Sequence, residues 1–159
     1  MTAPDLHPDL LPLAFLLGTW RGEGVGGYPT METFRYGEEV TFRHNGKPFL
    51  AYAQRTWSLD DERPLHAETG YWRPQPGGRL EVVMAHPTGV AEIYYGTVEG
   101  TKVELSTDVV VRTESAKEVT ALHRLFGLVE GELMYAVDMA AVGHPLQSHL
   151  SARLQRVPE

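Results

Sequence analysis

The sequence of 159 residues predicts an all-β protein, a single ten-stranded antiparallel up-and-down barrel with a short N-terminal helical turn. Apolar and polar residues alternate in most segments after Gly18, which is the period of a half-buried strand. Short connections rich in Gly, Pro, Asn and Asp separate these segments, so neighbouring strands are expected to form hairpins. An open sheet of this size would leave two long edges, whereas a closed barrel has none and can hold a ligand.

The elements are expected in this order along the chain. A flexible lead covers residues 1–9, and one barrel domain covers residues 10–159. The apolar run at residues 10–17 predicts one helical turn that plugs an end of the barrel. Strands are expected from Gly18 onward and then over residues 34–43, 49–57, 65–73, 80–86, 90–98, 102–111, 119–129, 133–141 and 145–154.

Three local features refine this expectation. Trp20 stands among Gly18, Gly22 and Gly24, which predicts an indole at the base of the barrel on a strongly bent first strand. Gly37 indicates a bulge in the next strand. The dipeptide that begins at Asn45 is Asn-Gly, which favours a two-residue hairpin turn.

Composition excludes several classes of function. The formal net charge is −7, which argues against nucleic acid and against an anionic membrane surface as partners. The chain has no cysteine, so neither disulfides nor thiolate chemistry are expected. Residues 1–9 carry no basic cluster, and no apolar run reaches the length of a membrane span. The sequence therefore predicts a soluble cytoplasmic protein.

A set of short motifs runs through most of the chain in order. They are Gly18-x-Trp20-x-Gly22-x-Gly24, Tyr28-Pro29-Thr30, Gly46-Lys47-Pro48, Pro64-Leu65-His66-Ala67-Glu68-x-Gly70-Tyr71, Ala116-Lys117 and His149-Leu150. Each is weak alone, but the combination resembles the nitrobindin family. The resemblance implies a barrel with the shape of lipocalins and fatty-acid-binding proteins that binds ferric haem b. It also implies isomerisation of peroxynitrite to nitrate, and binding of nitric oxide.

The resemblance also implies roles for individual residues. His149 matches the axial haem ligand of the family, and a neutral imidazole is a common ligand of haem iron. Thr30 and Lys117 match positions at the edge of the haem and the mouth of the pocket, where Lys117 would pair with a propionate. His66 lies in a region that the family places beside the haem. Met139 shares its strand face with Val137 and is expected to line the pocket, rather than to bind the iron.

Strand parity leaves one question open at His149. Leu150, Ala152 and Leu154 form an apolar face, and strict alternation would turn His149 away from it. Either a bulge lies near His149, or the face of Ser151 lines the pocket.

Alternative functions also remain open. The same barrel could carry an apolar molecule without catalysis, with Arg55 holding a carboxylate as in fatty-acid carriers. A haem protein could carry or sense nitric oxide without turnover. His66 and Glu68 share a strand face and could hold zinc in a hydrolase, with His86 as a third ligand, although nothing in the sequence ties His86 to them. A homodimer through the outer face of the barrel is also open.

Overall fold

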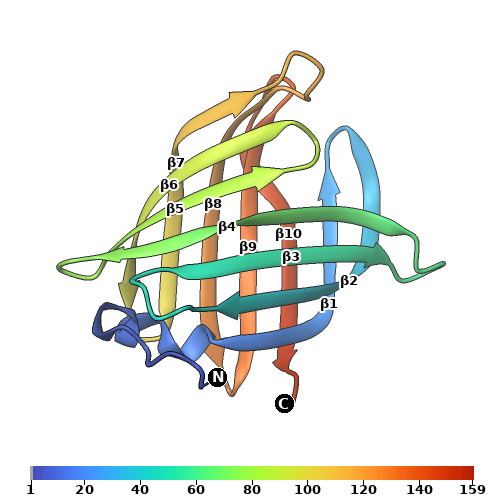
Figure 1. Cartoon of the computed structure of the whole chain (residues 1–159). Coiled ribbons are helices and arrows are strands. Elements are labelled where there is room, and N and C mark those ends of the chain that lie inside the picture. Colours follow the sequence, from blue (N-terminus) through green and yellow to red (C-terminus); the bar gives the residue numbers. More distant parts are fainter. Residues whose placement is uncertain (1) are drawn as a thin grey trace.

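The computed structural model describes residues 2–159, and Met1 lies outside this range. The described chain forms one 3₁₀ helix and ten strands that close into a single barrel (Figure 1). The elements are η1 (Pro8–Leu16), β1 (Gly18–Tyr28), β2 (Met31–Arg43), β3 (Leu50–Ser58), β4 (Pro64–Gln75), β5 (Arg79–His86), β6 (Val90–Glu99), β7 (Lys102–Arg112), β8 (Val119–Val129), β9 (Glu132–Ala141) and β10 (His144–Arg156). The predicted ten-stranded antiparallel barrel is confirmed.

Pairing of the first strand with the last closes the ring. β1 and β10 run antiparallel, with Trp20 opposite Arg156 and Gly26 opposite Leu150. Each of the other strands described pairs antiparallel with its neighbours in sequence. Closure therefore brings segments from the two ends of the chain side by side, and leaves neither β1 nor β10 as an edge strand.

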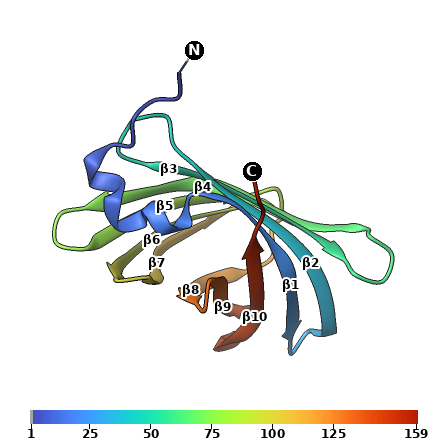
Figure 2. The ribbon, with the colours of Figure 1, turned by 90° about the horizontal axis from the view of Figure 1, so that it is seen from below.

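The short helix η1 closes one end of the barrel, as the apolar run predicted. Leu10, Leu13 and Leu16 are fully buried in the core, and η1 contacts β4 (Figure 2). The indole of Trp20 is also buried, and its Nε1 donates a hydrogen bond to the carbonyl of Leu16 at 2.9 Å. The expected packing role of Trp20 is confirmed. No helix within residues 2–159 is both long enough and apolar enough to cross a membrane.

The two ends of the barrel differ. The end with η1, called the base, is packed with large buried side chains, among them Trp20, Phe42 and Trp72. The opposite end, called the mouth, is formed by the connections at residues 29–30, 59–63, 87–89, 113–118 and 142–143. A ligand that enters the barrel along its axis must therefore enter at the mouth.

The wall of the barrel is incomplete near the mouth, between β7 and β8. The ladder between these strands runs only from Lys102 opposite Gly127 to Ser106 opposite His123. Beyond it, the Thr107 side chain bridges to the Leu122 backbone, accepting from its N–H at 3.0 Å and donating to its carbonyl at 3.3 Å. Beyond Ser106, no ladder pairs β7 with β8 within the described residues, up to the connection at residues 113–118.

Two local predictions are wrong. The connection between β2 and β3 spans residues 44–49 instead of a two-residue turn at Asn45. The ladder ends with Arg43 opposite Ala51, and Pro48, which lacks an N–H, cannot extend it. Gly37 is not a bulge, because the register continues through it on both sides. Its missing side chain instead makes room for the indole of Trp57, which a Cβ at this position would overlap.

The helix begins at Pro8, inside the lead expected over residues 1–9. The Nδ1 atom of His7 accepts a hydrogen bond from the Asp9 backbone N–H at 3.1 Å and so caps its first turn. The flexibility of the lead, and the division of the chain at residue 10, stay predictions.

Candidate functional site

His149 lies at a β-bulge in β10. Ser148 pairs with Asp138 of β9 and Leu150 pairs with the next residue, Val137, so His149 is the extra residue of the bulge. The bulge allows both His149 and Leu150 to be half-buried, which strict alternation would forbid. The first of the two arrangements left open by strand parity is therefore the one present.

The imidazole of His149 is fixed by a backbone carbonyl of the neighbouring strand. Nδ1 lies 3.0 Å from the carbonyl oxygen of Gly27 on β1, and a carbonyl can only accept, so Nδ1 carries the proton. The ring packs edge-on against Tyr28, with centroids 5.7 Å apart. No side chain within residues 2–159 hydrogen-bonds Nε2 of His149 in this arrangement. The lone pair of the neutral imidazole is therefore left on Nε2.

The surroundings of His149 favour its neutral form. Burial lowers the pKa of His149 below its usual 6.5, and the positive charges of His66, Arg124 and Lys117 act in the same direction, while the Gly27 carbonyl opposes them. A neutral imidazole whose Nδ1–H is held by a carbonyl is the form that binds haem iron through Nε2. The donor chemistry at this position therefore fits a haem group.

The other residues implied by the resemblance also lie at the mouth. Thr30 is exposed in the connection between β1 and β2, and Lys117 is exposed in the connection between β7 and β8. Met139 is half-buried on β9, and its backbone carbonyl accepts a hydrogen bond from the Tyr28 hydroxyl at 3.0 Å. His66 is half-exposed near the start of β4. These residues lie toward the same end of the barrel, and their contacts with a cofactor stay predictions.

Arg55 does not enter the barrel, so its expected role for a carried carboxylate is wrong. The buried face of β3 holds Tyr52, Gln54 and Thr56, and Arg55 belongs to the opposite face. On the outer face of the barrel, its guanidinium lies over the indole ring of Trp57 and pairs with Glu39 at 3.4 Å.

The buried arginine of the barrel is Arg124 on β8, and it is fully engaged. Its guanidinium pairs with Glu68 at 2.6 Å and donates to the Tyr94 hydroxyl at 2.8 Å. The Tyr52 hydroxyl donates to the same Glu68 oxygen at 2.9 Å, and the Tyr94 hydroxyl donates to Glu92 at 2.6 Å. Burial raises the pKa of Glu68, but Arg124 and His66 outweigh it and hold this pKa well below its usual range.

A second buried network surrounds Glu38 on β2. The Tyr135 hydroxyl donates to one oxygen of Glu38 at 2.6 Å, and Gln54 donates to the other at 3.0 Å. The Tyr36 hydroxyl lies 2.7 Å from that of Tyr135. Burial raises the pKa of Glu38 to about 7, although both hydrogen bonds lower it. Gln54 Oε1 is buried without a partner, so a flip of this amide would present an acceptor to a neutral Glu38.

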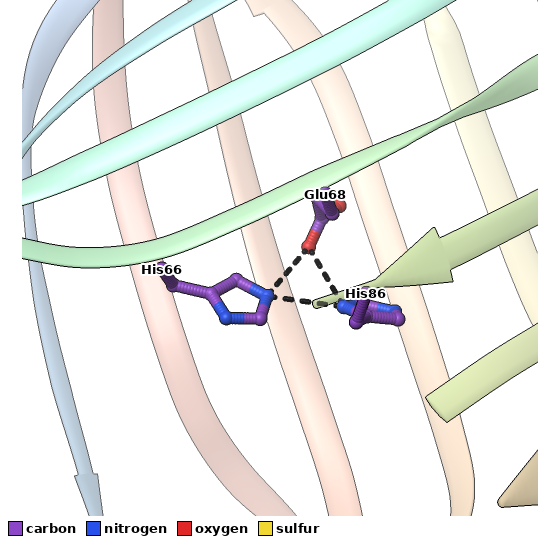
Figure 3. A group of neighbouring side chains, drawn as sticks. All are labelled: His66, Glu68 and His86. Carbon is purple, nitrogen blue, oxygen red and sulfur yellow. Dashed lines mark hydrogen bonds and ion pairs between the residues drawn. The ribbon is translucent and has the colours of Figure 1, made fainter. Parts of the chain in front are cut away.

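His66, Glu68 and His86 converge at the mouth side of the Arg124 network (Figure 3). His66 Nε2 lies 3.0 Å from His86 Nδ1 and 3.6 Å from Glu68 Oε1, and His86 Nδ1 lies 3.8 Å from the same oxygen. The register of β4 on β5, with Thr69 opposite Ala85, brings His86 to the other two.

Glu38, Glu92 and Arg124 are not among the residues that the motifs predict for the site. The sequence does contain a signal for buried charges. Glu68, Glu92 and Arg124 each stand where the alternation of their strand places apolar, core-facing residues. Charged residues on the core-facing side of a strand are expected to form pairs with one another. Which of them meet across the barrel depends on strand register, which the alternation does not reveal.

Comparison with known proteins agrees with the motifs. The family model described as a THAP4-like, heme-binding beta-barrel domain matches residues 9–156. A protein of Frankia casuarinae named peroxynitrite isomerase is 56% identical over 98% of this chain and 89% of its own. Peroxynitrite isomerase 1 of Mycolicibacterium paratuberculosis is 60% identical over 96% of this chain and 97% of its own.

A solved structure shares the whole barrel. The crystal structure of Rv2717c from M. tuberculosis matches with a TM-score of 0.91 and 48% identity, over 97% of this chain and 100% of that one. The family model and these relatives each cover nearly the entire barrel, so the resemblance drawn from the short motifs is confirmed. The chain belongs to the family of THAP4-like, heme-binding beta-barrel domains, the nitrobindin family.

Proposed function

We propose that this protein holds haem b at the mouth of its barrel and isomerises peroxynitrite to nitrate. Two findings support the proposal from outside the chain: the matching family model is described as heme-binding, and relatives of at least 54% identity over nearly the whole chain are named peroxynitrite isomerase. The support from the chain itself comes from His149.

The observation that carries the proposal is the state of the His149 imidazole. The bulge turns the ring inward, the Gly27 carbonyl takes the Nδ1 proton, and Nε2 keeps its lone pair. Burial keeps the ring neutral, so no proton competes for Nε2 near neutral pH. His149 would therefore hold the haem iron from the β10 side of the mouth.

The other residues at the mouth would bind and orient the cofactor. Lys117 would pair with a haem propionate, and the Thr30 hydroxyl would donate a hydrogen bond at the same rim. Met139 and Leu150, both packed against the core, would contact the apolar ring. His66 would lie at the ring edge. Together they would exclude water from one face of the haem.

Ferric haem, the state that we propose for the resting protein, supplies Lewis-acid activation of the O–O bond of peroxynitrite. Peroxynitrite and nitrate contain the same atoms and charge, so the chain needs no site for a reductant. The haem held by His149 would also bind nitric oxide, which we propose as a second ligand.

A carrier of apolar carboxylates is not favoured. Arg55 lies outside the barrel, and the buried Arg124 is already paired with Glu68. A carboxylate ligand would have to displace Glu68 and leave its charge unpaired in the core, which costs about 3–5 kcal/mol.

Two further properties are part of the proposal. The row Tyr71, Val83, Ile93 and Val109 runs across β4 to β7 in direct register and is exposed on the outer face, which supports a homodimer through this surface. The chain has no cysteine, which supports its placement in the cytoplasm.

The test is a hemin titration followed by absorbance in the Soret region, with His149→Ala beside the wild type and His144→Ala as the control. His144 is a second half-buried histidine on β10 that also packs against Tyr28. We expect a stoichiometric Soret shift in the wild type and the control, and a lost or altered shift in His149→Ala. No shift in the wild type would sink the haem proposal.

Turnover needs its own measurement. We expect the ferric, haem-loaded wild type to accelerate peroxynitrite decay with nitrate as the product, and apoprotein at the same concentration to leave the rate unchanged. Haem binding without acceleration would reduce the function to carrying or sensing nitric oxide.

A further inference from the structure

We propose that His66, Glu68 and His86 form a second metal site, which binds one divalent first-row transition-metal ion such as Zn²⁺. The ligands are His66 Nε2 and Glu68 Oε1 from β4, and His86 Nδ1 from the end of β5 (Figure 3). Two imidazoles and one carboxylate are the donor set of catalytic zinc sites and of mononuclear non-haem iron sites. The site shares His66 with the residues proposed to contact the haem edge, does not include His149, and goes beyond the proposed function.

The spacing of the three donor atoms fits an ion. They form a triangle with sides of 3.0, 3.6 and 3.8 Å. A point equidistant from the corners of such a triangle lies about 2 Å from each, which matches Zn–N and Zn–O bonds of about 2.0–2.2 Å. An ion can therefore occupy the site without a large movement of any ligand.

The strongest hydrogen bonds that hold Glu68 use the oxygen that does not converge. Glu68 Oε2 accepts from Arg124 at 2.6 Å and from Tyr52 at 2.9 Å, whereas Oε1 accepts one long hydrogen bond from Arg124 at 3.4 Å and keeps a lone pair for the ion. His86 Nε2 lies 2.9 Å from Glu92 Oε1, but out of line for a formed hydrogen bond. A small rotation of the ring completes the carboxylate–histidine–metal arrangement that orients many metal-bound histidines.

The local charge favours a cation. Glu68 and Glu92 carry two carboxylates against the single guanidinium of Arg124, and both histidines can bind as neutral ligands. Without an ion, the 3.0 Å contact between His66 and His86 is a hydrogen bond that shares one proton. Binding of the ion replaces that proton.

The site is accessible from solvent. The His66 side chain is 32% exposed, whereas Glu68 and His86 are 5% and 7% exposed. His66 also borders an open groove of about 550 Å³, whose lining includes the outward-facing Arg55 as well as Thr56 and Pro87. An ion can therefore enter past His66, and the three protein ligands leave at least one position for water or an anion.

The experiment is isothermal titration of the haem-loaded protein with Zn²⁺, and with Co²⁺ followed by visible absorbance. We expect one equivalent to bind. His86→Ala and His66→Ala should each weaken binding by at least about 100-fold, and Glu92→Gln by about 10-fold, as for other groups that orient a ligand. The two histidine variants avoid the buried Glu68–Arg124 pair, so the barrel stays folded.

His123→Ala is the matched control. His123 also lies beside two carboxylates, Glu104 at 3.0 Å and Asp138 at 3.8 Å, but these contact opposite nitrogens of its ring and do not converge. We expect its Zn²⁺ affinity to equal that of the wild type.

Three results would overturn the proposal: no stoichiometric binding to the haem-loaded protein, equal loss of affinity in His123→Ala, or unchanged affinity in the two ligand variants. Binding only to the haem-free protein would overturn it as well, because the cluster would then belong to the haem site. His149→Ala separates the two proposals, since it should lose haem and keep one Zn²⁺.

Discussion

Nδ1 of His149 on β10 lies 3.0 Å from the carbonyl oxygen of Gly27 on β1, so the last strand and the first strand together orient one imidazole. The contact exists only because the barrel closes, and the bulge at His149 adds the residue that turns the ring inward. The neutral, oriented imidazole is the reason why we propose this residue as the haem ligand.

Lys117→Ala should weaken haem binding by about 2- to 5-fold, because an exposed ion pair with a propionate contributes about 0.2–1 kcal/mol. The loss should shrink as salt is added. Lys102→Ala is the control, since Lys102 is an exposed lysine at the base end of β7. Hemin titrations at low and high ionic strength measure both, and an equal effect of the two variants would show that only net charge matters.

Glu38→Gln should change how stability depends on pH. The pKa of Glu38 is raised to about 7, so the unfolded chain loses this proton first, and the wild type loses stability as pH rises from about 4.5 to about 7. The contribution of this group is about 3 kcal/mol over that range. Relative to the wild type, the variant should therefore gain stability with rising pH.

Urea unfolding of both proteins at pH 5 and pH 8 measures this effect. Glu39→Gln is the control on the same strand, because Glu39 is paired with Arg21 and its pKa is lowered. A stability difference between wild type and Glu38→Gln that stays constant with pH would falsify the assignment of Glu38 as the titrating group.

Arg124→Leu should destabilise the barrel by about 3–5 kcal/mol, because it leaves the charge of Glu68 buried without its partner. The double variant Glu68→Leu with Arg124→Leu removes both charges and should recover part of that loss. Urea unfolding of the two single variants and the double variant, in the presence of a chelator, gives the coupling free energy. Additive effects would mean that the pair is not coupled.

Gly70→Ala should destabilise the protein by about 1–3 kcal/mol through overpacking. A Cβ at Gly70 on β4 would run into the carbonyl oxygen of Val83 on β5, and backbone cannot move aside cheaply. Gly127→Ala is the control, because a Cβ there would meet only the Thr101 carbonyl at 3.9 Å. Thermal unfolding should separate the two variants, and equal melting temperatures would contradict the steric argument.

Much of the fold could be predicted from the sequence, because each strand shows a local alternation of apolar and polar residues. The period-two pattern predicted all ten strands, and the apolar run before Gly18 predicted the plug formed by η1. The local predictions that failed depended on neighbours in space. The Asn45 turn is longer because the ladder stops at Arg43, and Gly37 accommodates Trp57 of the next strand.

The candidate site was predicted only in part. The motifs led to His149, and strand parity raised the question that the bulge answers. The alternation left an interior position of Arg55 open, whereas the structure shows that Tyr52 and Gln54 occupy the buried face of β3. His86 could not be tied to His66 and Glu68, because their meeting depends on the register of β5 against β4.

The sequence by itself determined the class of fold, the number of strands, the family and the identity of the proposed haem ligand. These follow from periodicity and from short motifs, which are local in the chain. Only the tertiary structure decided which side chains meet: Gly27 with His149, Glu68 with Arg124, and His66 with His86. The physical reason is that a shift of the strand register by one residue, or one bulge, turns a side chain to the other face of the sheet. The alternation of apolar and polar residues in the sequence stays the same in either case.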